Sequence, residues 1–314
     1  MKKTAINYII HNRPYFDSFK NEIKKITQKL KEDLKLNLFI TNLDRNWKQD
    51  KIDLERNGIS TDIFLIENGN YMAKINAAAS CGSTFSIKLD EDIFLSAALW
   101  DYFIANIGVL NDDKNLFLSP ILTTGIPSVD IFSEQFLSND EKQQLYKIYL
   151  QTPLPSIWGA NYSSLENFTL KANKWNCEKF YLEVSKINHH YKGVHPVRFS
   201  ANAQEFILKF VLENFDKMIN NSNFFLATEQ RPYFCNSVFG IKTATWQRIL
   251  NDKELFKDSF DEVPLNLYMQ QNNLNMVFIY NGYGVHPSYN TINVFGSDYK
   301  NLSDKFFNYE YFKR

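Results

Sequence analysis

The stretch Thr84-Phe-Ser-Ile-Lys-Leu-Asp-Glu-Asp-Ile-Phe-Leu95 decides the fold that the sequence predicts. An apolar run there leads into three consecutive acidic residues, Asp90, Glu91 and Asp92. Short apolar runs that end in polar residues are typical of buried strands. A buried strand ending in carboxylates would bring negative charge to the edge of the sheet at which open α/β proteins bind their ligands.

Strands and helices alternate on both sides of this stretch, which predicts a parallel sheet with right-handed crossovers. We therefore expect an α/β fold: a Rossmann-like, mostly parallel sheet flanked by helices, followed by a less regular α+β second half. The expected strands are Ala5–Ile10, Leu36–Thr41, Asp62–Ile66, Phe85–Leu89 and Met276–Tyr280, with further strands in FFLATEQ and SVFGIK. The expected helices span 14–34, 70–80, 94–107, 202–219 and 265–271.

Composition excludes several classes of protein. The 314 residues are 44% hydrophobic, which is enough for a large buried core. Positive and negative side chains balance to a formal net charge of zero, so we expect no nucleic-acid partner. No run of 18 apolar residues predicts a membrane-spanning helix. The three scattered cysteines suggest no disulfide framework, and we expect a cytoplasmic protein.

The acidic cluster has two interpretations. Oxygen ligands suit Mg²⁺ or Mn²⁺, and such ions often carry substrate phosphates with them. In an extended strand Asp90 and Asp92 project to the same side, roughly 6.6 Å apart. Both could therefore bind one ion only if the chain turns there; otherwise one binds the ion and the other a nearby ribose. Alternatively, the acidic residues cap the following helix and complement its dipole.

Polar residues near the other strand ends could complete a nucleotide site. Lys74 and Asn76 lie in the helix just before the acidic strand, where they could reach a diphosphate or a ribose. Asn12 and Arg13 follow the first strand, and Asp44 follows the second. The alternative is that these are ordinary polar turns and helix-surface residues, with Arg13 paired to Asp44 or Asp17.

This order of elements resembles the nucleotide-binding half of a GT-A-fold glycosyltransferase, close to glycosyltransferase family 2. The resemblance rests on strand–HNRP–helix, strand–NxD, Lys-x-Asn and strand–LDED, and it covers about the first 125 residues. It implies a donor-binding half over 1–125 and an acceptor-binding half over 126–314, packed as one unit. It also implies a nucleoside-diphosphate sugar bound by Asn12, Arg13, Asp44, Lys74, Asn76 and Asp90, with Asp92 on the metal. Asn42 departs from the family, which usually has an acidic residue there.

The second half offers candidates for the remaining roles. Asp261, or Glu262 as the alternative, resembles the general base of inverting members of the family, which deprotonates the acceptor hydroxyl. His286 follows a glycine-containing strand end and matches the late histidine that completes the metal shell in many GT-A enzymes. The alternatives are helix capping for Asp261 and a structural role for His286.

A histidine-rich segment includes His195 and Arg198, which we expect to bind an acceptor with an anionic group. A polar surface loop is the alternative. The predicted function is metal-dependent transfer of a sugar to a hydroxyl acceptor with inversion, using Mn²⁺ or Mg²⁺. The resemblance implies a glycan or lipid-linked acceptor, surface glycan synthesis and peripheral association with the inner face of the membrane. The rival functions are a sugar nucleotidyltransferase and a non-catalytic carbohydrate-binding protein.

Overall fold

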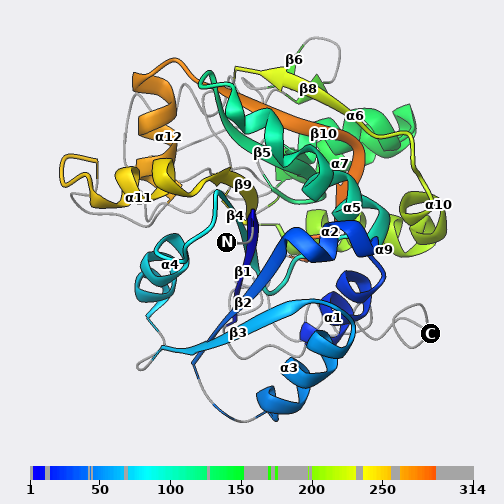
Figure 1. Ribbon diagram of the computed structural model, residues 1–314. Helices are drawn as coiled ribbons and strands as arrows, with labels where there is room; N and C mark the ends of the chain where they lie inside the picture. Colours follow the sequence, from blue (N-terminus) through cyan, green and yellow to red (C-terminus); the bar gives the residue numbers. More distant parts are fainter. Residues whose placement is uncertain are drawn as a thin grey trace. The chain divides into compact units, whose positions relative to one another are not determined.

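A computed structural model of the chain contains one large sheet flanked by helices, and its elements are labelled in Figure 1. The chain divides into two compact units. The first comprises 1–120, 221–230 and 236–282, and the second 121–220, 231–235 and 283–314. The structure describes residues 3–10, 15–41, 43, 45–66, 70–125, 128–151, 169–170, 174–175, 197, 200–230, 236–255 and 262–287.

Four parallel strands form one half of the sheet, as the sequence predicts. Their order is β3-β2-β1-β4, and neighbouring strands pair in parallel. Each strand is a short run rich in apolar residues, and β1 and β2 are almost entirely buried. In-register stacking of Phe39 on Phe64, with ring centroids 5.0 Å apart, contributes to the β2–β3 pairing. The bounds are Thr4–Ile9 for β1, Leu34–Ile40 for β2, Ser60–Leu65 for β3 and Phe85–Asp90 for β4.

The other half of the sheet is more mixed than the sequence suggests. The order continues β4-β9-β5-β10-β8, and β9 lies antiparallel to both β4 and β5. β8 also pairs with β10 in antiparallel fashion. The sequence predicts strands at β8, β9 and β10 but not at β5. The insertion of β9 beside β4 depends on pairing between residues far apart in the chain. The bounds are Asn115–Leu122 for β5, Phe225–Glu229 for β8, Val238–Lys242 for β9 and Asn275–Gly284 for β10.

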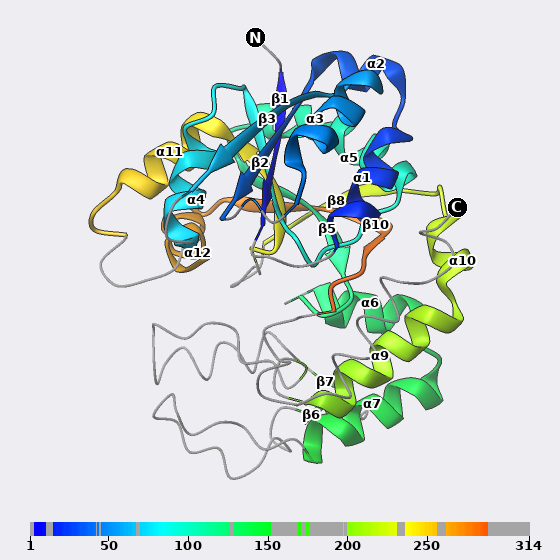
Figure 2. The same cartoon turned by 90° about the horizontal axis from the view of Figure 1, so that it is seen from below.

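Helices cover both faces of the sheet in the first unit (Figures 1 and 2). On one face Tyr8 packs against Phe19 of α1, with ring centroids 4.5 Å apart, and Phe19 contacts Trp100 of α5. On the other face Phe239 of β9 contacts Trp246 of α11. The bounds are Phe16–Lys24 for α1, Tyr71–Ala79 for α4, Ala97–Asn106 for α5, Thr243–Asn251 for α11 and Glu262–Gln271 for α12. Helix α3 spans Trp47–Arg56, and the 3₁₀ helix η2 spans Ile107–Asn111.

The helix expected over 14–34 is divided in the structure. Helix α1 ends at Lys24, α2 spans Gln28–Asp33, and β2 begins at Leu34. Thr27 between the helices is extended, and its backbone N–H donates to the Asp101 carboxylate over 2.9 Å. A tertiary contact therefore holds the backbone in a conformation that the helical periodicity does not predict.

The second unit is mainly helical in its described part. Phe136 contacts Tyr283 edge-to-face, with ring centroids 3.9 Å apart, and Phe132 contacts Phe210. Its helices are α6 (Ser128–Phe136), α7 (Asn139–Gln151), α9 (Ala201–Glu213) and α10 (Phe215–Ile219), and its short strands are β6 (Thr169–Leu170) and β7 (Lys174–Trp175). Over the described residues of the whole chain, none of the helices is long and apolar enough to cross a bilayer.

Candidate active site

The acidic cluster lies at the switch point of the parallel strands. From β1 the chain adds β2 and β3 on one side of β1, whereas β4 pairs on its other side. Asp90, the last residue of β4, is in register with Ile9, the last residue of β1. Open α/β sheets bind ligands outside the carboxyl ends of their strands at this kind of reversal. The topology therefore places the cluster where a ligand site is expected.

The chain turns immediately after Asp90 rather than continuing as a strand. Residues 91 and 92 form a turn, and the Ile93 N–H donates to the Asp90 carbonyl over 3.3 Å. Glu91 and Asp92 are buried, whereas the Asp90 side chain is 22% exposed. The simple alternation of faces expected for a strand does not hold here. Such a turn is required for Asp90 and Asp92 to bind one ion together, and the backbone has it.

The acidic residues are separated from the start of α5, which has other caps. The helix begins at Ala97 rather than near Phe94, and the Ser96 hydroxyl accepts from the Leu99 N–H over 3.3 Å. The Glu22 carboxylate accepts from the Ala97 N–H over 2.9 Å. Ser96 and Glu22 thus perform the N-terminal capping that the sequence left as an alternative role for Asp90–Asp92.

Two buried lysines bring positive charge to the same edge of the sheet. Lys88 forms an ion pair with Asp90 over 2.7 Å and donates to the Asn236 carbonyl, also over 2.7 Å. Lys74 of α4 is fully buried and donates to the Ile10 carbonyl at the end of β1. Burial lowers the pKa of Lys74 to about 8, although the charge of Glu91 acts in the opposite direction. The protonation of Lys74 is therefore sensitive to charge added nearby.

Tyr8 supports the acidic turn from inside the sheet. Its hydroxyl donates to the Glu91 carbonyl over 3.1 Å. Burial raises the pKa of Tyr8 well above its ordinary value, and the charges of Glu91 and Asp92 raise it further. The phenol therefore stays protonated and can donate this hydrogen bond. Sequence reasoning identified neither Tyr8 nor Lys88 as a site residue. Lys88 had a signal, because it sits two residues from Asp90 and hence on the same face of β4.

In its described part, the structure does not bring the other residues predicted for the donor site together with the acidic turn. Asn76 is exposed and lies two positions from the buried Lys74, so the two side chains leave α4 in different directions. Asn12, Arg13 and Asp44 lie outside the described residues, and their roles stay predictions. Asp17, one suggested partner of Arg13, is bound by Arg45 over 2.5 Å.

Glu262 is the described member of the predicted base pair. It is the first residue of α12, it is 7% exposed, and its Oε1 atom has no hydrogen-bond partner among the described residues. A buried carboxylate oxygen without a partner is uncommon and calls for an explanation, such as a ligand that supplies the donor. Asp261, the favoured base, lies outside the described residues, as do His195 and Arg198.

His286 follows β10 in the second unit. Its backbone N–H donates to the Thr123 hydroxyl over 3.1 Å, and the Thr124 hydroxyl donates to its carbonyl. Asp92 belongs to the first unit, so a metal shared by the two residues stays a prediction. Within the described part of the chain, no group of three or more His, Cys, Asp or Glu residues is arranged to hold a metal ion. The acidic turn nevertheless fits Mg²⁺ or Mn²⁺, because Mg²⁺ commonly binds one or two carboxylates together with substrate phosphates.

Comparison with solved structures finds weak similarities, including the two below. No family model and no curated protein matches the sequence. The fold is similar to that of GalNAc-T7 with UDP, GalNAc and Mn²⁺, with 12% identity and a TM-score of 0.48, over 90% of this chain and 43% of that one. A cytidylyltransferase from Leptospira borgpetersenii serovar Hardjo-bovis aligns with 16% identity and a TM-score of 0.27, over 38% of this chain and 53% of that one. The chain thus spans about half of each protein or less. Similarities of this strength carry no argument about function.

Proposed function

We propose that the protein is a metal-dependent glycosyltransferase that moves a sugar from a nucleoside-diphosphate donor to a hydroxyl acceptor. The observation that carries this proposal is the acidic turn Asp90–Asp92 at the switch point between β1 and β4. Two features support a ligand-binding role for this turn: α5 is capped by other residues, and the buried Lys74 lies at the same edge. Paired carboxylates bind a diphosphate through a divalent ion, and a lysine binds it directly.

In this proposal the donor is held at the carboxyl edge of the parallel strands. Asp92, with His286, would ligate Mn²⁺ or Mg²⁺, and Asp90 would contact the metal or the ribose. When bound, the cation would offset the negative charge of the leaving diphosphate. Lys74 would stabilise the same charge from α4. Nucleoside contacts are proposed for Asn12, Arg13, Asp44 and Asn76.

The acceptor hydroxyl requires a base close to the donor sugar. We propose Asp261 for this role, with Glu262 as the alternative; direct attack on the anomeric carbon would invert its configuration. The buried Oε1 of Glu262 supports the alternative, because it has no partner in the described part of the chain and an acceptor hydroxyl could supply the donor. His195 and Arg198 are proposed to bind an anionic group of the acceptor. The acceptor class we propose is a glycan or lipid-linked glycan made at the cytoplasmic face of a membrane.

A thermal-shift screen tests the donor site. We expect at least one nucleoside-diphosphate sugar to raise the melting temperature in the presence of Mn²⁺, because a ligand that binds only the folded state stabilises it by mass action. Asp92→Asn should remove the metal-dependent part of this increase. If no nucleotide or nucleotide sugar has any effect with or without metal, a donor site at the acidic turn is refuted.

The base assignment needs a separate test with the donor that the screen identifies. Asp261→Asn or Glu262→Gln, whichever removes the base, should reduce transfer by at least 100-fold while the donor affinity changes little. The other variant serves as the matched control. Near-normal turnover in both variants would contradict base catalysis by this pair without affecting the donor-site assignment.

A further inference from the structure

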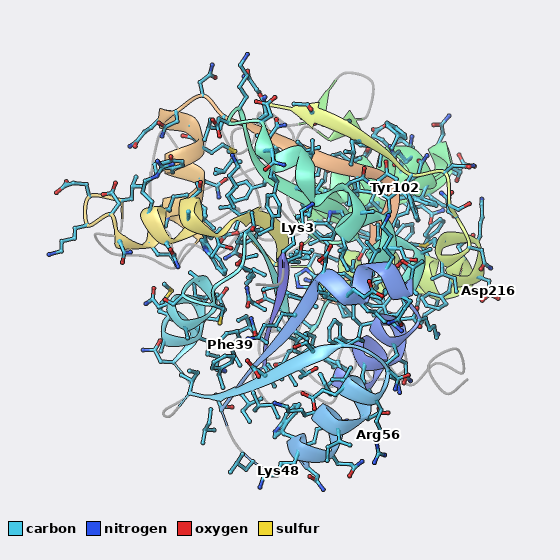
Figure 3. All side chains as sticks on the ribbon, viewed as in Figure 1. Lys3, Phe39, Lys48, Arg56, Tyr102 and Asp216 are labelled. Carbon is cyan, nitrogen blue, oxygen red and sulfur yellow. The ribbon has the colours of Figure 1, made fainter. Side chains whose placement is uncertain are left out.

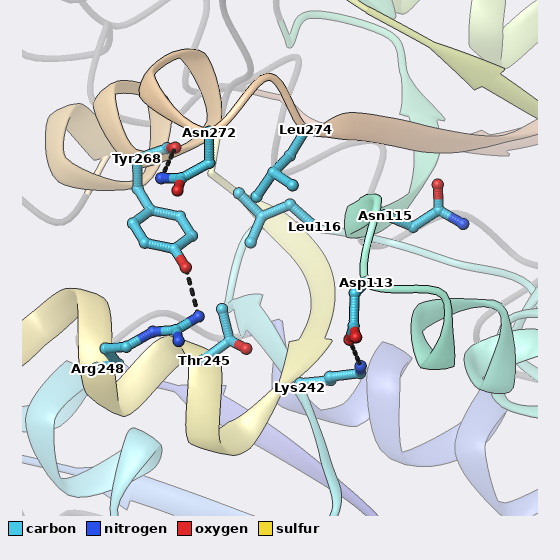
Figure 4. A pocket seen from close by; sticks show the side chains of 9 residues that line it. All are labelled: Asp113, Asn115, Leu116, Lys242, Thr245, Arg248, Tyr268, Asn272 and Leu274. Carbon is cyan, nitrogen blue, oxygen red and sulfur yellow. Dashed lines mark hydrogen bonds and ion pairs between the residues drawn. The ribbon is translucent and has the colours of Figure 1, made fainter.

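A cavity lies at the end of β4 opposite to the acidic turn. Lys242 at the end of β9 is in register with Phe85, the first residue of β4, whereas the acidic turn follows the last residue of β4. The cavity beside Lys242 has a volume of about 440 Å³ (Figure 4). It is lined by Asp113, Asn115, Leu116, Lys242, Thr245, Arg248, Tyr268, Asn272 and Leu274.

Two helices and the sheet build this cavity, and all of its lining residues belong to the first unit. Lys242 ends β9 directly before α11, and Thr245 and Arg248 follow it at three-residue spacing within the helix, so the three form one polar stripe. Tyr268 and Asn272 are four residues apart at the end of α12 and face this stripe across the cavity (Figure 4). Leu116 of β5 and Leu274, just before β10, lie between them and provide apolar surface.

Arg248 is the cation most available to a ligand. Its Cζ atom lies 5.3 Å from the Tyr268 ring centroid. It also donates to the Tyr268 hydroxyl. No ion pair of Arg248 with a carboxylate is found among the described residues, and the side chain is exposed. Tyr268 therefore orients the guanidinium without neutralising its charge.

Lys242 adds a second positive charge that a ligand can share. It pairs with Asp113 over 2.6 Å, but the Asp113 side chain is 95% exposed. Exposed ion pairs of this kind contribute little and are easily exchanged for another anion. Two cations against one solvated carboxylate give the cavity a net positive charge, which favours a ligand with more than one negative charge.

We propose that this cavity binds a phosphorylated sugar. A phosphate monoester carries about −1.5 to −2 charges at pH 7 and matches the guanidinium fork and the ammonium group. The volume of about 440 Å³ exceeds what phosphate alone needs and lies in the range of small-molecule pockets. Thr245 and Asn272 can hydrogen-bond to sugar hydroxyls, while Tyr268, Leu116 and Leu274 offer apolar surface to the ring. The site needs neither the metal nor the donor of the proposed reaction.

Isothermal titration of the full chain with glucose 6-phosphate, without Mn²⁺ or nucleotide, tests the proposal. We expect saturable binding that Arg248→Gln weakens at least tenfold, since a charge-assisted hydrogen bond is worth more than 1.4 kcal/mol. Tyr268→Phe keeps the ring but removes the hydroxyl that holds the guanidinium, and we expect a smaller, several-fold loss. Arg56→Gln is the matched control, because Arg56 is also an exposed arginine in the last turn of a helix (Figure 3).

Two further measurements test whether the cavity recognises both the sugar and the phosphate, and whether the acidic turn contributes to binding. Glucose and inorganic phosphate should each bind at least tenfold more weakly than glucose 6-phosphate, because each lacks half of the recognised groups. Asp92→Asn should leave the affinity for glucose 6-phosphate unchanged, because the acidic turn lies at the other end of β4. The proposal is overturned if glucose 6-phosphate does not bind, if Arg248→Gln binds it as well as the wild type, or if inorganic phosphate binds equally well.

Discussion

Replacing Lys74 by methionine should change how the stability of the protein depends on pH. Lys74 is fully buried, and burial lowers its pKa from 10.5 to about 8. Between these two values the unfolded chain carries a proton that the folded protein lacks. The free energy of unfolding of the wild type should therefore rise with pH in this window, and the buried charge should cost the most stability below pH 8.

The size of the effect follows from the two pKa values of Lys74. At 1.36 kcal/mol per pH unit, lowering the pKa from 10.5 to about 8 corresponds to a penalty of roughly 3 kcal/mol at neutral pH. About 2.5 kcal/mol of this penalty should be relieved between pH 7 and pH 10. Methionine has a similar length but no charge, so Lys74→Met lacks this dependence. The lost hydrogen bond to Ile10 shifts the stability of the variant by an amount that does not vary with pH.

Urea denaturation of both proteins at pH 7, 8, 9 and 10 measures the difference. The free energy of unfolding of the wild type, relative to that of Lys74→Met, should increase by about 2.5 kcal/mol from pH 7 to pH 10. Lys209→Met removes a lysine whose side chain is 58% exposed and controls for the loss of a charge. If the curves of the wild type and Lys74→Met are parallel across this range, the account of Lys74 is wrong.

Three further predictions concern the surroundings of the acidic turn. Donor binding at pH 8 should take up roughly half a proton in the wild type, because a nearby diphosphate raises the pKa of Lys74; calorimetry in two buffers should find no uptake in Lys74→Met. Ser96→Ala should lower the free energy of unfolding, measured in urea, by about 1 kcal/mol but leave Mn²⁺-dependent donor binding unchanged; a loss of donor binding would show that the cap of α5 also supports the donor site. The hydrogen bond from Arg45 lowers the pKa of Asp17, so the stability difference between wild type and Arg45→Met should shrink as the pH falls below 4; a constant difference would exclude this linkage.

The parallel half of the sheet is predictable because its signals are local. Each of β1 to β4 is a short apolar run, and each is followed by a helix or a polar turn. Asp90–Asp92 could be placed at the carboxyl edge for the same reason, since the end of an apolar run marks the end of a strand. The parallel direction of these strands, and hence the edge at which they end, follows from the helices that connect them, whereas their order does not.

What the sequence does not show depends on contacts between distant residues. No local pattern indicates that β9 pairs with β4, or that the Glu22 carboxylate caps α5 from a distant helix. Thr27 is extended between two helices in a segment whose apolar residues keep helical spacing throughout. From the sequence Tyr8 is indistinguishable from an ordinary core residue, because the hydrogen bond from its hydroxyl to the Glu91 carbonyl forms only when β1 and β4 are paired. The cavity beside Arg248 likewise combines β5, β9, α11 and α12.

The most direct test of the central claim is to locate Mn²⁺ by anomalous diffraction. Crystals of the protein with Mn²⁺ and a nucleoside diphosphate would be measured on both sides of the manganese absorption edge. A peak within about 2.3 Å of an Asp92 carboxylate oxygen, with a diphosphate oxygen as a further ligand, is the predicted result. A diphosphate bound elsewhere on the protein, or a manganese peak that does not touch the Asp90–Asp92 turn, would contradict it.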